Sequence, residues 1–163
     1  MITELIYVAL LTLIPTLELR AGIPYGFIAL SSIPYAWVYV FIVAVLTNIL
    51  LGPIIYFILD KFVHLIRRIK FIDKIYIKKV SHIHEKIFPK TELYGDIALS
   101  LFIAIPLPGT GSYTGALAAY ILGIKPKRFF WINLLGVVIA GIIVTIIMLS
   151  GSELFSLLIK TFF

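Results

Sequence analysis

The chain has 163 residues, of which 61% are hydrophobic and 13% are charged, and its formal net charge is +6. The charged fraction is far below the roughly 25% of soluble domains, which excludes a soluble globular protein and indicates one integral membrane unit over residues 1–163. The absence of cysteine excludes a disulfide framework and a thiolate metal site, and we expect neither a metal nor a cofactor. Positive charge in a membrane protein is typical of loops that face the cytoplasm, so membrane lipids are the expected partners and nucleic acid is not.

The first apolar segment, residues 5–31, is broken by Pro15, Gly22 and Pro24. Its uninterrupted part, residues 5–14, would be about 15 Å long as a helix, which is half of the ~30 Å hydrocarbon core. Two interpretations remain open at this point. The segment is either one broken helix that crosses the membrane once, or two half-helices that meet in a re-entrant hairpin.

The next run, residues 35–59, contains no charged residue and predicts a transmembrane helix. Asn48, Gly52 and Pro53 lie inside it. This combination favours a kink with close helix packing over a ligand site.

Residues 60–96 contain nine of the 14 Lys and Arg residues and all three His residues. Apolar residues recur here at spacings of three and four, and most basic residues fall off that stripe. The pattern predicts a basic amphipathic helix on the membrane surface. A solvated helix that packs on the rest of the protein is an equal alternative, and both can hold.

A second broken apolar segment, residues 97–123, is followed by a second predicted transmembrane helix at residues 129–149 and by a tail, residues 151–163, that predicts a short surface helix. Three breakers interrupt the second segment: Pro106, Pro108 and Gly115. The two halves of the chain, residues 1–59 and 97–150, therefore share one order of elements, which predicts a structural repeat.

The distribution of positive charge decides between the two interpretations of the broken segments. If each segment crossed the membrane, the linker 60–96 and the cluster at Lys125–Arg128 would lie on opposite sides, which the positive-inside rule disfavours. Re-entrant hairpins place 12 of the 14 basic residues on one side. We therefore predict an all-α integral membrane protein of the cell (inner or plasma) membrane, an inverted repeat of re-entrant hairpin plus transmembrane helix. Both basic loops are cytoplasmic and both termini face the outer side.

Glu18 and Arg20 are the only charged residues between Glu4 and Asp60. Charges at membrane depth are costly and must face protein, water or a ligand, so both residues are functional candidates. Arg20 has a planar fork of donors that suits a phosphate or carboxylate, and Glu18 could carry a coupled proton. The alternative is that the two neutralise each other or cap broken helix ends.

The second turn offers complementary chemistry. Its glycines allow close backbone approach, its hydroxyls can bind a ligand, and a half-helix that begins near Ser112 would aim backbone amides at the membrane centre. Tyr113 would serve as wall or donor. Tight packing is an equal explanation for Gly115. The predicted substrate-binding residues of this turn, which join Arg20, are Gly109, Thr110, Gly111, Ser112, Tyr113 and Thr114.

Two motifs in the chain resemble a prokaryotic membrane family named "putative small multidrug export proteins": Glu18-Leu-Arg20-Ala-Gly22-Ile-Pro24 and Ile105-Pro-Leu-Pro-Gly-Thr-Gly111-Ser-Tyr-Thr-Gly115. The common variant of the second motif has Ala-Trp at Ser112-Tyr113. The family is more distantly similar to the DedA family and its SNARE-associated, VTT-type relatives, to which flipping of polyprenyl phosphates or phospholipids is attributed. The resemblance implies hairpin-plus-helix architecture and transport.

Four functions are compatible with these residues. The leading hypothesis is a secondary transporter or flippase for an amphiphilic anion, above all a phosphorylated lipid, with Arg20 on the headgroup and Glu18 coupling a proton. The others are proton-coupled export of cationic drugs, a structural or assembly role without transport, and an ion channel. No Walker A loop or Ser-His-Asp set is present, so we expect no enzyme. Two spans enclose little volume, and we expect a homodimer.

Overall fold

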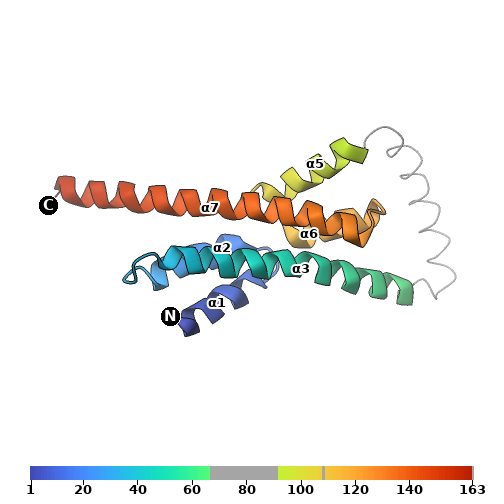
Figure 1. The fold of residues 1–163 in the computed structure, drawn as a ribbon, viewed down its shortest axis with the longest axis horizontal. Coiled ribbons are helices and arrows are strands. Elements are labelled where there is room, and N and C mark those ends of the chain that lie inside the picture. The colour runs from blue at the N-terminus through green and yellow to red at the C-terminus, as the bar shows by residue number, and fades with distance from the viewer. Residues whose placement is uncertain (67–91, 108, 163) are drawn as a thin grey trace.

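The computed structural model describes residues 1–66, 92–107 and 109–162, and within these ranges the secondary structure consists of helices joined by turns, with no strand (Figure 1). This confirms the all-α prediction for the described part of the chain. The helices are α1 (Ile2–Thr12), α2 (Glu18–Ala29), α3 (Ala36–Ile66), α5 (Glu92–Ala104), α6 (Ser112–Ile121) and α7 (Pro126–Phe162).

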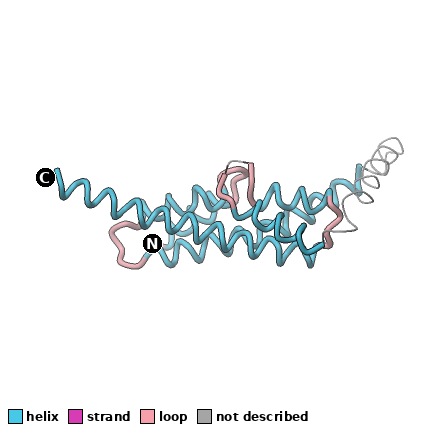
Figure 2. The backbone as a smooth tube through the Cα atoms, turned by 90° about the horizontal axis from the view of Figure 1, so that it is seen from above, coloured by secondary structure: helices cyan, strands magenta, loops and turns pink. Residues whose placement is uncertain are grey.

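Two long helices, α3 and α7, run side by side along the bundle, and a pair of short helices lies at each end (Figures 1 and 2). The α1–α2 pair packs at the end where the 30–35 connection and both chain termini lie. The α5–α6 pair packs at the opposite end, beside the 122–125 connection. The turn of each pair, residues 13–17 and 105–111, therefore points to the middle of the bundle.

Both long helices contain a stretch that is long and apolar enough to cross a membrane, Ala36–Val63 and Pro126–Gly151. The predicted transmembrane helices are thus confirmed as candidate spans, but both helices are longer than predicted. The prediction of a separate surface helix at residues 151–163 is wrong, because α7 continues without a break to Phe162. Gly151 is the only helix breaker there, and one glycine costs only about 1 kcal/mol within a helix.

The predicted linker, residues 60–96, is also shorter than expected. Residues 60–66 belong to α3 and residues 92–96 to α5. Apolar residues continue at helical spacing from the transmembrane run into residues 60–66. The helix therefore does not end where the charged residues begin. The amphipathic prediction for residues 67–91 lies outside the described residues.

Three of the predicted turn residues lie inside helices instead. Gly22 and Pro24 are in α2, and Gly115 is in α6. Gly22 and Gly115 serve close packing, since an added Cβ would collide with Thr12 on α1 and with Ile103 on α5 respectively. Pro24 has no N–H to donate within α2, but the good helix formers Glu18-Leu-Arg-Ala carry the helix up to it.

Small residues also bring the long helices close to their neighbours. A Cβ at Gly26 of α2 would overlap Val40 of α3, and a Cβ at Gly136 of α7 would lie 2.7 Å from both Ile103 and the carbonyl of Ser100. Close backbone approach of this kind provides the van der Waals contact that holds helices together where lipid replaces water. These contacts hold α2 against α3 and α5 against α7.

Candidate functional site

The first turn ends at Glu18, the first residue of α2, and it has an unusual backbone. Glu18 has a φ of 47° and Thr16 a φ of 70°, both in the left-handed region that side chains other than glycine rarely adopt. Such conformations cost about 1–3 kcal/mol each, and surrounding contacts must maintain them. The side chain of Glu18 provides those contacts.

The carboxylate of Glu18 is only 3% exposed and accepts three hydrogen bonds. Two come from backbone N–H groups at the start of α6: Ser112 N lies 3.1 Å from Oε2 and Tyr113 N lies 3.2 Å from Oε1. The third comes from Nδ2 of Asn48 on α3, 3.1 Å from Oε2. One buried carboxylate therefore joins both hairpins to a long helix.

The start of α6 needs this acceptor because it has no cap of its own. The N-cap residue is Gly111, which carries no side chain to accept a bond and has a φ of 117°. Free N–H groups at a helix start attract negative charge, and Glu18 supplies it from the other hairpin. A Cβ at Gly111 would lie within 2.8 Å of the Glu18 carboxylate carbon, so only glycine permits this approach.

Arg20 lies two residues after Glu18 on α2 and binds the second turn. Its Nη1 donates to the carbonyl of Leu107. Its Nη2 lies 2.6 Å from the carbonyl of Thr110 and 2.7 Å from its Oγ1. The planar fork of the guanidinium thus satisfies carbonyls in an irregular stretch that has no helix to pair them.

Thr110 also holds the second turn together. Its Oγ1 lies 2.6 Å from the carbonyl of Ile105 and 2.8 Å from that of Leu107. The hydroxyl therefore lies at the centre of the turn, between the Arg20 guanidinium and the end of α5.

Tyr113 makes the reverse connection, from the second hairpin to the first. Its phenol donates to the carbonyl of Leu13, at the end of α1, over 2.6 Å. Side chains of Glu18, Arg20 and Tyr113 thus cross between the turns in both directions. These bonds confirm the prediction that the two turns are in contact.

The side chains of the remaining predicted site residues are not directed at this contact, although the backbone N–H of Ser112 takes part in it. The Thr114 hydroxyl bonds the carbonyl of Gly111 within its own helix, and Ser112 Oγ lies 3.4 Å from the carbonyl of Asn48. Gly109 has open space around it and is needed for its φ of 87°. Turn positions Pro15 and Pro106 interrupt the helices as predicted, and Pro108 lies outside the described residues.

Two buried amides belong to this region and were assigned no role from the sequence. Asn48 is 1% exposed and binds Glu18, and Asn133 of α7 is fully buried and lies 3.3 Å from the carbonyl of Ile49. In the sequence, each of them is an amide side chain within an apolar run, and this pattern could have indicated a buried polar contact. For Asn48, the neighbouring Gly52 and Pro53 made a kink the simpler explanation.

The two charged side chains of this site, Glu18 and Arg20, are both hydrogen-bonded to groups of the protein. Every described partner of the Glu18 carboxylate is an N–H donor, and every described partner of the Arg20 guanidinium is an oxygen. The part of the chain that the structure describes contains no group of three or more His, Cys, Asp or Glu residues that could hold a metal. Carbonyls and amides exchange partners without covalent chemistry, so the site suits binding and rearrangement.

Comparison with known proteins identifies the family. No curated protein matches the chain, and no solved structure does. A family model described as "Putative small multi-drug export protein" matches residues 18–143, from the first residue of α2 to the middle of α7. The match begins directly after the first turn and includes the second turn, the whole first candidate span and most of the second, and the chain belongs to this family of membrane proteins.

Proposed function

We propose that the protein is a secondary transporter that moves an amphiphilic anion, above all a phosphorylated lipid, across the cell membrane. The α1–α2 and α5–α6 pairs are, in this proposal, re-entrant hairpins of an inverted repeat. They enter from opposite faces and meet at the Glu18–α6 contact. The lipid is the anion that the resemblance to the DedA family implies, and the geometry of the contact supports an anion.

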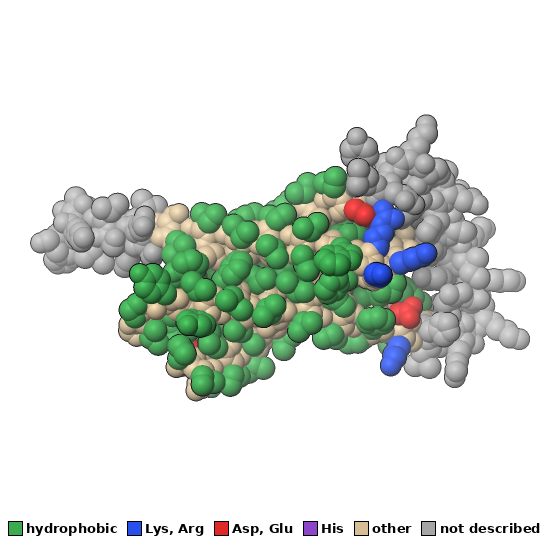
Figure 3. All heavy atoms as spheres, viewed as in Figure 1, with side chains coloured by type: hydrophobic (Ala, Val, Ile, Leu, Met, Phe, Trp, Pro, Cys, Tyr) green, Lys and Arg blue, Asp and Glu red, His purple; other side chains and the backbone are tan. Residues whose placement is uncertain are grey.

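The placement of the basic residues supports this topology. Lys61 lies near the end of α3, and Lys125, Lys127 and Arg128 lie at or just before the start of α7; both segments are at one end of the bundle (Figure 1), where blue side chains gather in Figure 3. The 30–35 connection at the other end contains no charged residue. The basic end faces the cytoplasm in our proposal, following the positive-inside rule, and the termini face outward.

The observation that carries the proposal is the position of the Glu18 carboxylate on the amides of Ser112 and Tyr113. A helix start with free amides is a ready anion site, and here a carboxylate of the protein itself occupies it. Glu18 therefore stands where the anionic group of a substrate would bind. Arg20 lies beside it on the same helix and can offer its fork to the same group.

This arrangement suggests how a proton could be coupled to the substrate. A proton on Glu18 removes the charge that holds the α6 amides and disfavours the contact. The substrate phosphate then takes the amides, and the guanidinium of Arg20 exchanges its carbonyl partners for phosphate oxygens. The two hairpins separate or close according to which anion is bound, which gives the two states that a transporter needs.

Flux measurements in proteoliposomes test the proposal. The probe is a fluorescent polyprenyl phosphate, and its appearance in the opposite leaflet is followed with and without an imposed pH gradient. We expect Arg20→Ala to reduce the flux at least tenfold. Glu18→Gln should retain flux but lose its dependence on the gradient, because a neutral amide cannot release a proton.

A matched control separates transport from stability. Tyr56→Phe removes a buried 2.8 Å bond from α3 to the carbonyl of Ile124, away from both turns. Tyr56→Phe should keep the flux while its free energy of unfolding falls by an amount similar to that in Arg20→Ala. Flux of the lipid that is unchanged in folded Arg20→Ala would overturn the assignment.

A second candidate function is proton-coupled export of a cationic drug. The family description and the buried Glu18 carboxylate favour it. In that case a lipophilic cation would compete with the α6 amides for Glu18, and Arg20 would not meet the substrate. Efflux of ethidium that is abolished by Glu18→Gln and kept by Arg20→Ala, with no phosphate-lipid flux, selects this function over the first.

A further inference from the structure

A groove of about 430 Å³ lies between α5 and α7, at the basic end of the bundle. It is separate from the contact between the turns and involves neither Glu18 nor Arg20. Its wall includes Asp96 and Leu101 on α5 and Arg128, Trp131, Leu135 and Ile139 on α7.

The floor of the groove is closed. Ser100 Oγ donates to the carbonyl of Ile132 over 3.2 Å, which ties α5 to α7 beneath the opening. One helical turn further, Gly136 lets the backbone of α7 approach Ile103 and Ser100 closely. The groove therefore opens outward, onto the surface that would face lipid, and does not lead into the core.

The groove has one charged end and one apolar end. Arg128 and Asp96 form an ion pair of 2.7 Å at the charged end, with side-chain exposures of 35% and 27%. Toward the other end, Leu101 and Leu135 are more than half exposed. Arg128 and Ile139 are eleven residues apart on α7, which is about 16 Å of helix. The shape and polarity fit a molecule with a charged head and an alkyl tail.

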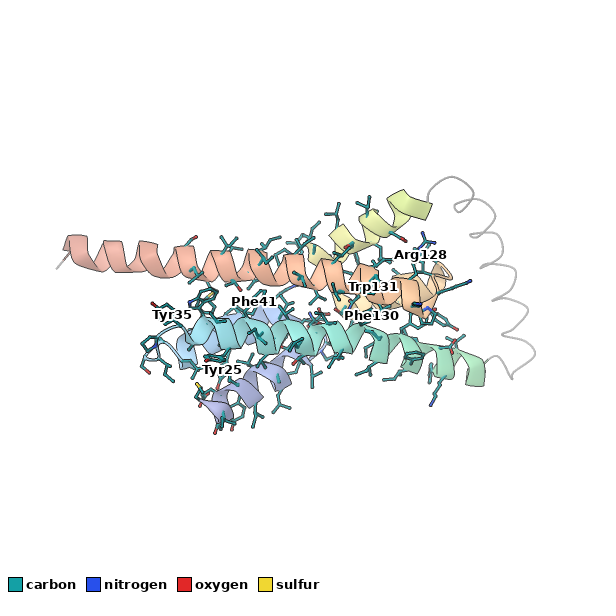
Figure 4. All side chains as sticks on the ribbon, viewed as in Figure 1. Tyr25, Tyr35, Phe41, Arg128, Phe130 and Trp131 are labelled. Carbon is teal, nitrogen blue, oxygen red and sulfur yellow. The ribbon has the colours of Figure 1, made fainter. Side chains whose placement is uncertain are left out.

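The charge at the head end selects the sign of that molecule. Lys125, just before α7, and Lys127 in its first turn are both exposed and lie beside Arg128, and the acid that the groove wall places against them is Asp96. Figure 4 shows Arg128 and Trp131 close to the start of α7. A tryptophan that is 58% exposed next to a basic cluster is typical of a side chain at the headgroup level of a bilayer.

We propose that this groove is a binding site for an anionic phospholipid of the surrounding bilayer. One acyl chain lies along Leu101, Leu135 and Ile139, and the phosphate lies against Arg128 and Lys127. Asp96 competes with the phosphate for the Arg128 guanidinium and so limits the affinity. This proposal does not depend on transport activity. It is the same whichever substrate binds at the turns.

The two tryptophans of the chain make a direct test available. In a Trp37→Phe protein, Trp131 is the sole fluorescent tryptophan and lies in the groove wall. The protein is placed in bilayers that contain brominated phosphatidylglycerol or brominated phosphatidylcholine, and quenching is measured against the mole fraction of brominated lipid. We expect half-quenching by the anionic lipid at a mole fraction three- to tenfold lower than by the zwitterionic lipid.

Variants of the charged end test the assignment of the headgroup. Arg128→Gln and Lys127→Gln should each reduce the preference for the anionic lipid at least twofold, and Asp96→Asn should increase it. Lys61→Gln, at the same end but on α3, should leave it unchanged. If the Arg128–Asp96 pair served packing alone, Asp96→Asn would not raise the preference, and that result would overturn the proposal.

A second reporter separates the groove from general attraction to the basic end. Trp37→Phe/Trp131→Phe/Ile58→Trp places the only tryptophan on α3, at a site that is 55% exposed near the same end. It should show a much weaker preference between the two lipids. Equal preference at residues 58 and 131 would mean that no site exists in the groove.

Discussion

The carboxylate of Glu18 accepts a hydrogen bond from the backbone N–H of Ser112, which lies 94 residues further along the chain. This bond caps a helix of one hairpin with a side chain of the other. Because the carboxylate is 3% exposed, neither partner has ready access to water as an alternative. In the proposed transport cycle, the two hairpins would separate when Glu18 takes up a proton or when another anion binds the amides.

The first prediction concerns the stability that Glu18 provides. Glu18→Ala leaves the N–H groups of Ser112, Tyr113 and Asn48 without an acceptor, and we expect a loss of roughly 2–4 kcal/mol. Glu18→Gln keeps one acceptor oxygen and should lose about half as much. Thermal unfolding in detergent measures both. Glu4→Gln, which affects the bond from the Tyr25 phenol, is the control and should cost clearly less than Glu18→Ala.

The second prediction concerns the shape of the Arg20 side chain. The guanidinium reaches the carbonyls of Leu107 and Thr110 with two nitrogens, and a lysine ammonium cannot reproduce that fork. Arg20→Lys should therefore lower the free energy of unfolding by roughly 1–3 kcal/mol although the charge is kept. Arg128→Lys, at an ion pair whose side chains are about one-third exposed, should cost below about 1 kcal/mol. Equal losses in the two variants would contradict a specific role for the fork.

The third prediction compares two glycines of the same turn. Both Gly109 and Gly111 have positive φ angles, so alanine is strained at either position by about 1 kcal/mol or more. Only at Gly111 would the new Cβ also collide with the Glu18 carboxylate. Gly111→Ala should therefore be clearly less stable than Gly109→Ala. A double variant, Glu18→Ala/Gly111→Ala, should remove most of that difference, because the collision partner is gone.

The order of the helices could be predicted from hydropathy and length alone. An apolar stretch such as residues 5–14 is too short to span a bilayer, and residues 35–59 are long enough, so the alternation of short and long helices follows from the sequence. The extent of the first turn could not be predicted in the same way. Gly22 and Pro24 are normally helix breakers, yet close packing against Thr12 keeps one of them inside α2.

The contact between Glu18 and α6 was predictable only in part. An acid and a base within an apolar segment indicated a polar site, and the glycine-rich second turn indicated exposed amides. The structure places the N-cap of α6 at Gly111, which has no side chain, although Thr110 and Ser112 beside it carry hydroxyls, so another group accepts from the first amides. Arg20 has only donors and cannot take this role, so Glu18 was the charged candidate of the first turn. Its position on the amides goes with the left-handed backbone at Glu18, a tertiary feature with no local sequence signal.

The last prediction tests the topology, using the absence of cysteine from the chain. Single cysteines are introduced at three exposed positions: Thr3, Ser32 and Lys127. If α1 and α2 form a re-entrant hairpin, Thr3→Cys and Ser32→Cys should react with a membrane-impermeant maleimide from the same side, and Lys127→Cys from the opposite side. A broken helix that crosses once would place residues 3 and 32 on opposite sides. In intact cells we expect labelling at the first two positions and at Lys127→Cys only after permeabilisation, because the basic end should face the cytoplasm.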